Sequence, residues 1–157
     1  MTRLAALALA LVLAAALTHS VRADEDARAI AQDVLNKGSA LFDAKDVAGL
    51  LATYDDDPAV VWVEKDGTTG EVKESVKRGK AEVESLYADH FKNVSEKTTS
   101  KNVVEHARSI GPDMLLITGT FQPDVAKPGK YPFVQLRVKK GDRWLLKDLH
   151  LFTTAVD

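Results

Sequence analysis

The chain is 157 residues long, is 45% hydrophobic and carries a formal net charge of −2. This balance is typical of one folded domain and not of a disordered chain. The sequence contains no cysteine, which excludes disulfides, thiolate metal sites and a cysteine nucleophile. Its pI of about 6.1 gives no basic footprint for a nucleic-acid partner.

Residues 1–23 have the pattern of a secretory signal peptide. A basic residue precedes an uninterrupted apolar run of 14 residues, Leu4 to Leu17, and Val21 and Ala23 fit a cleavage site. The run is shorter than the roughly 20 residues that a membrane-spanning helix requires. The sequence therefore predicts a leader that is removed, export to the periplasm or the cell exterior, and one mature domain, residues 24–157, that does not remain in a membrane.

Helical periodicity marks three segments of the mature domain. Residues 24–44 form the longest, and its first turn is acidic, as the helix dipole favours. Asp46 is placed to cap a second, short helix that ends at Tyr54, before an aspartate run. A third helix over 80–93 has one apolar stripe, formed by Val83, Leu86, Tyr87, His90 and Phe91.

Strand signals occupy most of the remaining chain. β-Branched and aromatic residues predict a strand at 59–64 and a short second one at 71–77. After residue 98 the period changes, which predicts four consecutive antiparallel strands, at 99–109, 113–123, 131–140 and 143–154. Helices at the front and strands at the back indicate an α+β fold, with helices covering one face of a curved antiparallel sheet.

Three stretches carry a family resemblance: Ala40 to Glu64, Arg78 to Phe91 and Lys139 to Phe152. They resemble the nuclear-transport-factor-2-like superfamily, in its SnoaL-like and ketosteroid-isomerase-like branch, and the resemblance extends over essentially the whole mature domain. It implies a cone-shaped α+β fold, in which a strongly bent antiparallel sheet wraps a long N-terminal helix and two shorter helices, with a pocket between them. It also implies that homodimers are common, and that members include isomerases, dehydratases and proteins that only bind or oligomerise.

The last strand carries the candidate catalytic residues. With a period of two, Trp144, Leu146, Asp148, His150 and Phe152 share one face. The resemblance implies that this face looks into the cone. A carboxylate beside a histidine can orient the ring and raise its pKa, which suits a general acid or base. Asp148 and His150 are thus the candidate catalytic pair; the alternative is that His150 is an interior residue or lies at the sheet margin.

The opposite face of the last strand carries Leu145, Leu149 and Leu151 around Lys147. A sheet buried on both faces needs two covers, and the helices supply only one. We therefore expect a homodimer built on this outer face through the three leucines. The alternative is a monomer in which the lysine stem shields them.

Aromatic and apolar side chains are the candidates for lining the pocket, although most such residues simply form the core. The candidates are Tyr54, Trp62, Tyr87, Phe91, Trp144 and Leu146. Gln135 and Arg137 share one face of the strand at 131–140, and Arg137 could clamp a carboxylate or phosphate if that face points inward. The default interpretation places this face in solvent.

The run Asp55-Asp56-Asp57 allows a second catalytic hypothesis. In ketosteroid-isomerase-like enzymes an aspartate near the first strand acts as general base beside an oxyanion site. Asp56 or Asp57 lies roughly there, but the tyrosine of the first helix that such a site uses is absent. A solvated turn ended by Pro58 is the preferred interpretation. The histidine spacing fits no metal site, and the sequence implies no cofactor.

Three functions remain, in order of preference. The first is an exported protein that binds a small apolar or amphipathic molecule in its cone pocket. The second is a cofactor-independent isomerase or lyase that uses His150 with Asp148 for proton transfer. The third is an interaction module that binds through the outer sheet face.

Overall fold

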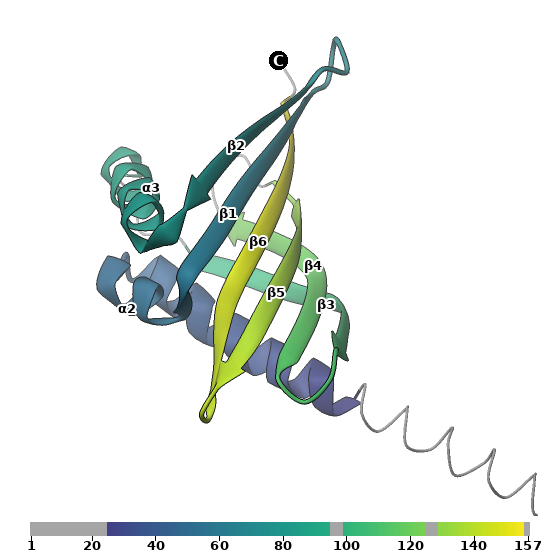
Figure 1. The fold of residues 1–157 in the computed structure, drawn as a ribbon. Coiled ribbons are helices and arrows are strands. Elements are labelled where there is room, and N and C mark those ends of the chain that lie inside the picture. Colours follow the sequence, from purple (N-terminus) through teal and green to yellow (C-terminus); the bar gives the residue numbers. More distant parts are fainter. Residues whose placement is uncertain (1–24, 95–98, 125–128, 156–157) are drawn as a thin grey trace, which may run out of the picture.

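The computed structural model describes residues 25–94, 99–124 and 129–155, so the predicted signal peptide lies outside the described residues (Figure 1). An N-terminal helix covers residues 25–43. It is followed by α2 (Val47–Ala52), β1 (Tyr54–Asp66), β2 (Val72–Arg78), α3 (Gly79–Asn93), β3 (Thr99–Ser109), β4 (Met114–Asp124), β5 (Tyr131–Lys140) and β6 (Arg143–Ala155). Within these ranges, no helix combines the length and the apolar character needed to cross a bilayer.

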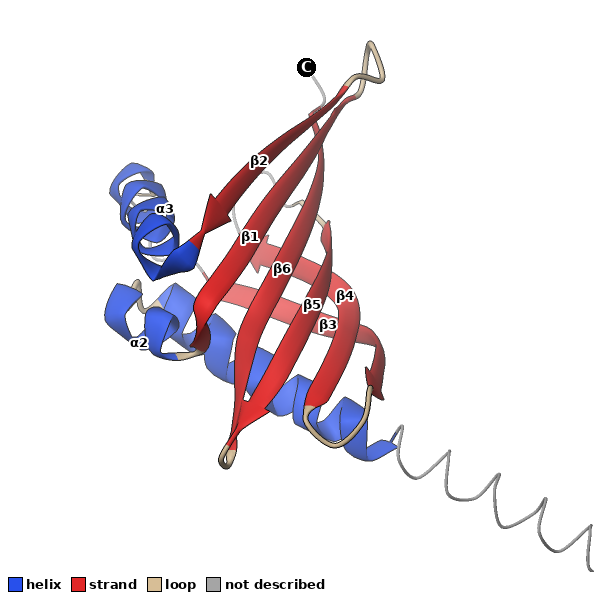
Figure 2. Ribbon diagram, viewed as in Figure 1, coloured by secondary structure: helices blue, strands red, loops and turns tan. Residues whose placement is uncertain are grey.

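All six strands form one curved sheet, in the order β2-β1-β6-β5-β4-β3. The strands β3 to β6 pair antiparallel in sequence order, as predicted, but β1 pairs with β6 in parallel. The helices lie on one side of this sheet, with α2 and α3 near β1 and the N-terminal helix crossing the other strands (Figure 2). The predicted α+β architecture, with a bent sheet over a long N-terminal helix, is confirmed; the parallel pair is its one departure from an antiparallel sheet.

Two apolar clusters attach the helices to the sheet. Ala27, Ala31 and Leu35 recur every four positions on the N-terminal helix and pack against a set of sheet residues that includes Leu115 and Ile117. The second cluster joins α3 to β1 and β6 through Tyr54, Val60, Val83 and Leu146. The helices are thus anchored at two separate places.

The start of β1 differs from its prediction. The sequence predicts a solvated turn at the aspartate run, but β1 begins at Tyr54 and includes this run. The register with β6 shifts between Tyr54 and Ala59, and Pro58 is buried in that interval. A proline has no N–H for a sheet ladder, so it is tolerated where the pairing is interrupted.

A bulge in β6 changes which side chains face the helices. Arg137 of β5 pairs with Leu146, and Leu136 pairs with Asp148, so Lys147 has no partner in β5. One extra residue reverses the alternation of faces beyond it. The expected common face of Trp144, Leu146, Asp148, His150 and Phe152 is therefore wrong, because the last three follow the bulge. The expected grouping of Leu149 and Leu151 with Leu145 fails for the same reason.

Candidate functional site

A cavity of about 340 Å³ lies between the helix-covered face of the sheet and the helices. The N-terminal helix contributes Leu35 and Phe42, and α3 contributes Leu86. Beyond the bulge, β6 contributes Leu149 and Leu151, which reach the cavity because the alternation has reversed there. Most of the lining is apolar.

Phe42 is the centre of an aromatic wall. Its ring lies 5.1 Å from that of Phe91 and 5.5 Å from that of Phe121, both edge to face. It also contacts Tyr87, whose ring centroid is 6.4 Å away. Edge-to-face packing of this kind holds rings in fixed orientations. The wall therefore joins the N-terminal helix, α3 and β4 around a preformed space.

Two buried polar residues of β5, Gln135 and Arg137, also line the cavity, with exposed fractions of 7% and 4%. The Arg137 guanidinium donates from Nε and Nη2 to Gln135 Oε1, at 3.1 and 2.9 Å. Its Nη1 donates to the Trp144 carbonyl at 3.4 Å. The default expectation that this face of the strand is solvated is wrong, because the sheet turns it toward the helices.

The charge of Arg137 persists despite its burial. Desolvation lowers the pKa of Arg137 to about 10, partly offset by the nearby hydroxyls of Tyr54 and Tyr87. A group with that pKa is protonated at neutral pH. The cavity therefore contains a permanent positive charge.

Tyr54 and Tyr87 add a hydroxyl pair, and their oxygens lie 2.5 Å apart. Burial raises the pKa of Tyr54 well above its ordinary value and raises that of Tyr87 as well, while the Arg137 charge acts in the opposite direction. Both hydroxyls are therefore neutral at neutral pH. One donates to the other, and one proton remains available to a third group.

Other polar lining residues are Asn102, whose Nδ2 donates to Ser39 Oγ at 2.6 Å, and His90. Burial and the nearby Lys45 lower the pKa of His90, so its ring is neutral at neutral pH. Trp62 is 37% exposed, and its Nε1 donates to Thr153 Oγ1 at 3.1 Å.

Four of the predicted pocket residues, Tyr54, Trp62, Tyr87 and Leu146, line the cavity. Two others are not among its lining residues. Phe91 stacks against Tyr87 with the ring centroids 6.0 Å apart. Trp144 packs against the cluster around the N-terminal helix.

Asp148 and His150 do not line the cavity. The β6 bulge puts them on the outer face of the sheet, where Asp148 lies between Ala59 and Leu136. His150 lies between Val61 and Val134 on the same face. Neither side chain forms a hydrogen bond or ion pair within the described parts of the chain. The prediction that this pair faces the pocket is wrong.

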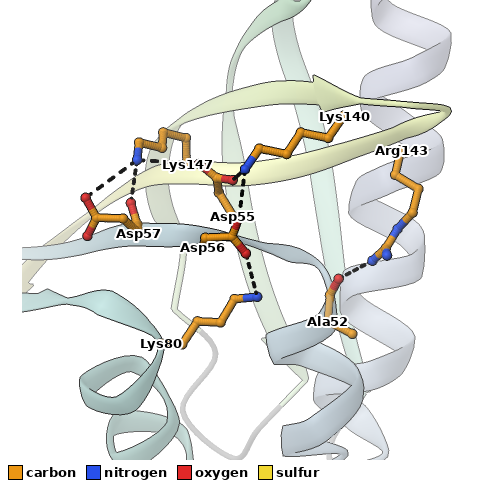
Figure 3. Close-up of polar contacts among 8 residues, drawn as sticks. All are labelled: Ala52, Asp55, Asp56, Asp57, Lys80, Lys140, Arg143 and Lys147. Atoms are coloured by element: carbon orange, nitrogen blue, oxygen red, sulfur yellow. Dashed lines mark hydrogen bonds and ion pairs between the residues drawn. The ribbon is translucent and has the colours of Figure 1, made fainter.

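Asp55, Asp56 and Asp57 form ion pairs with lysines and are not among the residues that line the cavity (Figure 3). Asp55 contacts Lys140 Nζ at 2.5 Å and Lys147 Nζ at 3.4 Å. Asp56 contacts the same Lys140 Nζ at 2.9 Å, and Asp57 lies 3.8 Å from Lys147 Nζ. Hydrogen bonding to Lys140 is the main cause that lowers the pKa of Asp55 and Asp56. These carboxylates hold β1 to β5 and β6.

Sequence comparison finds no relative: no family model matches the chain, and no curated protein does. Solved structures do match it. An uncharacterised protein with a cystatin-like fold from Caulobacter vibrioides has a TM-score of 0.63 at 16% identity, over 84% of this chain and 91% of that one. A nuclear-transport-factor-2-like protein of unknown function from Pseudomonas putida has a TM-score of 0.62 at 15% identity, over 85% and 87%.

A ketosteroid isomerase-like protein from Erwinia carotovora is more distant in shape, with a TM-score of 0.55 at 17% identity, over 75% of this chain and 88% of that one. At such identities the likeness concerns the fold alone. The chain therefore has the nuclear-transport-factor-2-like, or cystatin-like, fold. The predicted resemblance is confirmed at that level, and its SnoaL-like branch stays a prediction.

Proposed function

We propose that the chain is a binding protein for a small apolar or amphipathic molecule, which it holds in the cavity between the sheet and the helices. The observation that carries this proposal is the cavity itself, about 340 Å³ in volume and lined mainly by leucines and aromatic rings. Small-ligand pockets have this form: a mostly apolar, preformed space with a few placed polar groups. The fixed aromatic wall around Phe42 supports preorganised binding.

Binding is preferred to proton transfer because of where the candidate catalytic pair lies. Asp148 and His150 are on the outer face, with the sheet between them and the cavity. A general base must reach the proton that it abstracts from the bound molecule. The pair therefore gives no support to an isomerase or lyase that acts inside the cavity.

The proposal includes export, as the pattern of residues 1–23 predicts, and a homodimer on the outer sheet face. Leu149 and Leu151, which the sequence assigns to this interface, line the cavity and do not belong to it. Leu145 remains outside, where it pairs with Val138. Val134 and Leu136 alternate with buried cavity residues and so lie on the same outer face.

A neutral fluorescent probe, N-phenyl-1-naphthylamine, tests the binding proposal on the mature domain. We expect saturable binding of about one probe per chain, with enhanced fluorescence. Gly38 lines the cavity on the N-terminal helix, and a Cβ there would meet no atom within 4 Å. Gly38→Leu should therefore fill the space and weaken binding at least about tenfold, while Ala40→Leu, on the same helix outside the lining, should not. Binding that is absent, or equal in both variants, would contradict the proposal.

A further inference from the structure

We propose that the molecule held in the cavity carries one negative charge, and that Arg137 binds it as a carboxylate. This inference rests on the proposed binding function and gives it a chemical class: an amphipathic monocarboxylate, with its acid group at Arg137 and its apolar body against the leucines and aromatic rings.

The first argument is the charge balance of the cavity. Arg137 is 4% exposed. Over residues 25–94, 99–124 and 129–155, no carboxylate lies within 4 Å of its guanidinium, and no Asp or Glu lines the cavity. The aspartates at the start of β1 pair with Lys140 and Lys147 instead. A buried cation without an anion is costly, and proteins normally pair such a charge.

The second argument is the set of free donors on Arg137. A guanidinium has five N–H groups. Three are used: Nε and one Nη2 hydrogen bond Gln135 Oε1, and one Nη1 hydrogen points to the Trp144 carbonyl. One hydrogen on each Nη is left without an acceptor in the described part of the chain. The two Nη groups can therefore each donate to one of the two oxygens of a carboxylate.

Gln135 has a positioning role. Its Oε1 accepts two bonds from Arg137, which fixes the guanidinium plane. Its Nε2 donates to no acceptor among the described residues, so this residue of the cavity lining has a further donor. The Tyr54–Tyr87 pair lines the same cavity and has one hydroxyl proton to give. The polar end of the cavity therefore presents donors and a positive charge to its occupant.

The number of charges selects among anions. A dianion such as a phosphate monoester would leave one negative charge uncompensated among apolar side chains. A neutral molecule would leave Arg137 unpaired. A monocarboxylate neutralises the one cation and places its hydrocarbon part where the lining is apolar. This match also predicts that a carboxylate built into the protein beside Arg137 would replace the ligand.

Two matched probes test the inference by calorimetry on the mature domain at neutral pH: octanoate and the neutral octanamide. We expect the wild type to bind octanoate at least about tenfold more tightly than octanamide, because of the charge-assisted bonds to Arg137. Arg137→Met, which keeps much of the side-chain volume, should abolish this preference. Binding of N-phenyl-1-naphthylamine to the same variant shows whether the cavity has survived the change.

Gln135→Glu is the second variant, and it should raise stability while it weakens ligand binding. Its carboxylate would pair with Arg137, so we expect a higher Tm together with at least about tenfold weaker octanoate binding. Gln122→Glu, on β4 outside the lining, is the control. It should neither raise the Tm nor weaken octanoate binding. A Gln135→Glu variant that binds octanoate as tightly as the wild type would overturn the role of Arg137.

The outcomes separate the two proposals. Equal binding of octanoate and octanamide, with the naphthylamine probe still bound, would leave the binding function standing and remove the anion from it. No binding of any of the three would remove both. Octyl phosphate that binds as tightly as octanoate would contradict the choice of a monoanion.

Discussion

The hydroxyl oxygens of Tyr54 and Tyr87 lie 2.5 Å apart, although 33 positions separate the two residues in the sequence. The bond joins the first residue of β1 to the middle of α3 inside the same cavity. Tyr54 is 2% exposed, so its hydroxyl depends on this partner. The pair therefore contributes to stability as a unit.

A double-mutant cycle tests this unit. Tyr54→Phe and Tyr87→Phe each leave one buried hydroxyl without its partner, so each should destabilise the fold by about 1–3 kcal/mol. The double variant removes both hydroxyls and leaves two apolar rings, so its loss should be smaller than the sum. Urea unfolding of the three variants and the wild type measures the coupling. Strict additivity would show that the two hydroxyls do not depend on each other.

The packing beneath the N-terminal helix predicts a contrast between two isoleucines. Ile117 is 0% exposed in the main cluster, whereas Ile110, just after β3, is 40% exposed. The same substitution by alanine should cost about 2–5 kcal/mol at Ile117, because it opens a cavity. At Ile110 it should cost less than about 1 kcal/mol, because solvent replaces the lost atoms. Chemical denaturation compares them, and similar losses would contradict the assigned core.

Two glycines should respond to alanine with opposite signs. A Cβ at Gly119 would lie 2.3 Å from the Val103 carbonyl oxygen and 2.8 Å from Phe133 Cζ, so Gly119→Ala must displace backbone or ring. Gly38 is inside a helix, and a Cβ there meets nothing within 4 Å. Gly38→Ala should stabilise the protein by about 0.5–1 kcal/mol, since glycine is a poor helix former. Thermal unfolding should show Tm rising for Gly38→Ala and falling for Gly119→Ala.

The ion pairs at the start of β1 predict a pH dependence. Hydrogen bonding to Lys140 lowers the pKa of Asp55 in the folded state. A lowered pKa stabilises the fold fully above the unfolded value, about 3.9, and the contribution is lost as the pH falls through the folded value. Asp55→Asn should therefore be less stable than the wild type at neutral pH, and the gap should shrink in acid. Asp142→Asn, in the exposed turn between β5 and β6, is the control in urea unfolding at both pH values.

The sequence predicted the elements well, because their periodicity and caps are local. Asp46, for example, caps α2 as expected and accepts from the Gly49 N–H at 2.8 Å. The sequence did not predict correctly which side chains of β6 face the helices. Counting by two assumes an uninterrupted ladder, and the bulge at Lys147 depends on pairing with β5, which is not a local property. The adjacent polar residues Lys147 and Asp148, which interrupt the alternation between Leu146 and Leu149, are the local sign of it.

Alternation along β5 also misplaces Arg137. Its strand has apolar residues at 134, 136 and 138 and polar residues at 135 and 137, so alternation alone favours the apolar set as the inner face. The structure buries Gln135 and Arg137 instead and leaves the apolar set outside. A polar inner face is unusual for a core and typical of a site that recognises a ligand.

The apolar residues at 134, 136 and 138 on the outer face of β5 predict how a charge introduced there would affect dimer formation. Leu136 is partly exposed on the outer face, beside Asp148 and Leu116. If a second chain covers this face, Leu136→Arg should convert a dimer into a monomer, since a buried interface rejects an unpaired charge. Ile110→Arg is the matched control, because Ile110 lies in the turn between β3 and β4, away from this face, and is 40% exposed. Sedimentation velocity at micromolar concentration measures both, and a monomeric wild type would disprove the dimer.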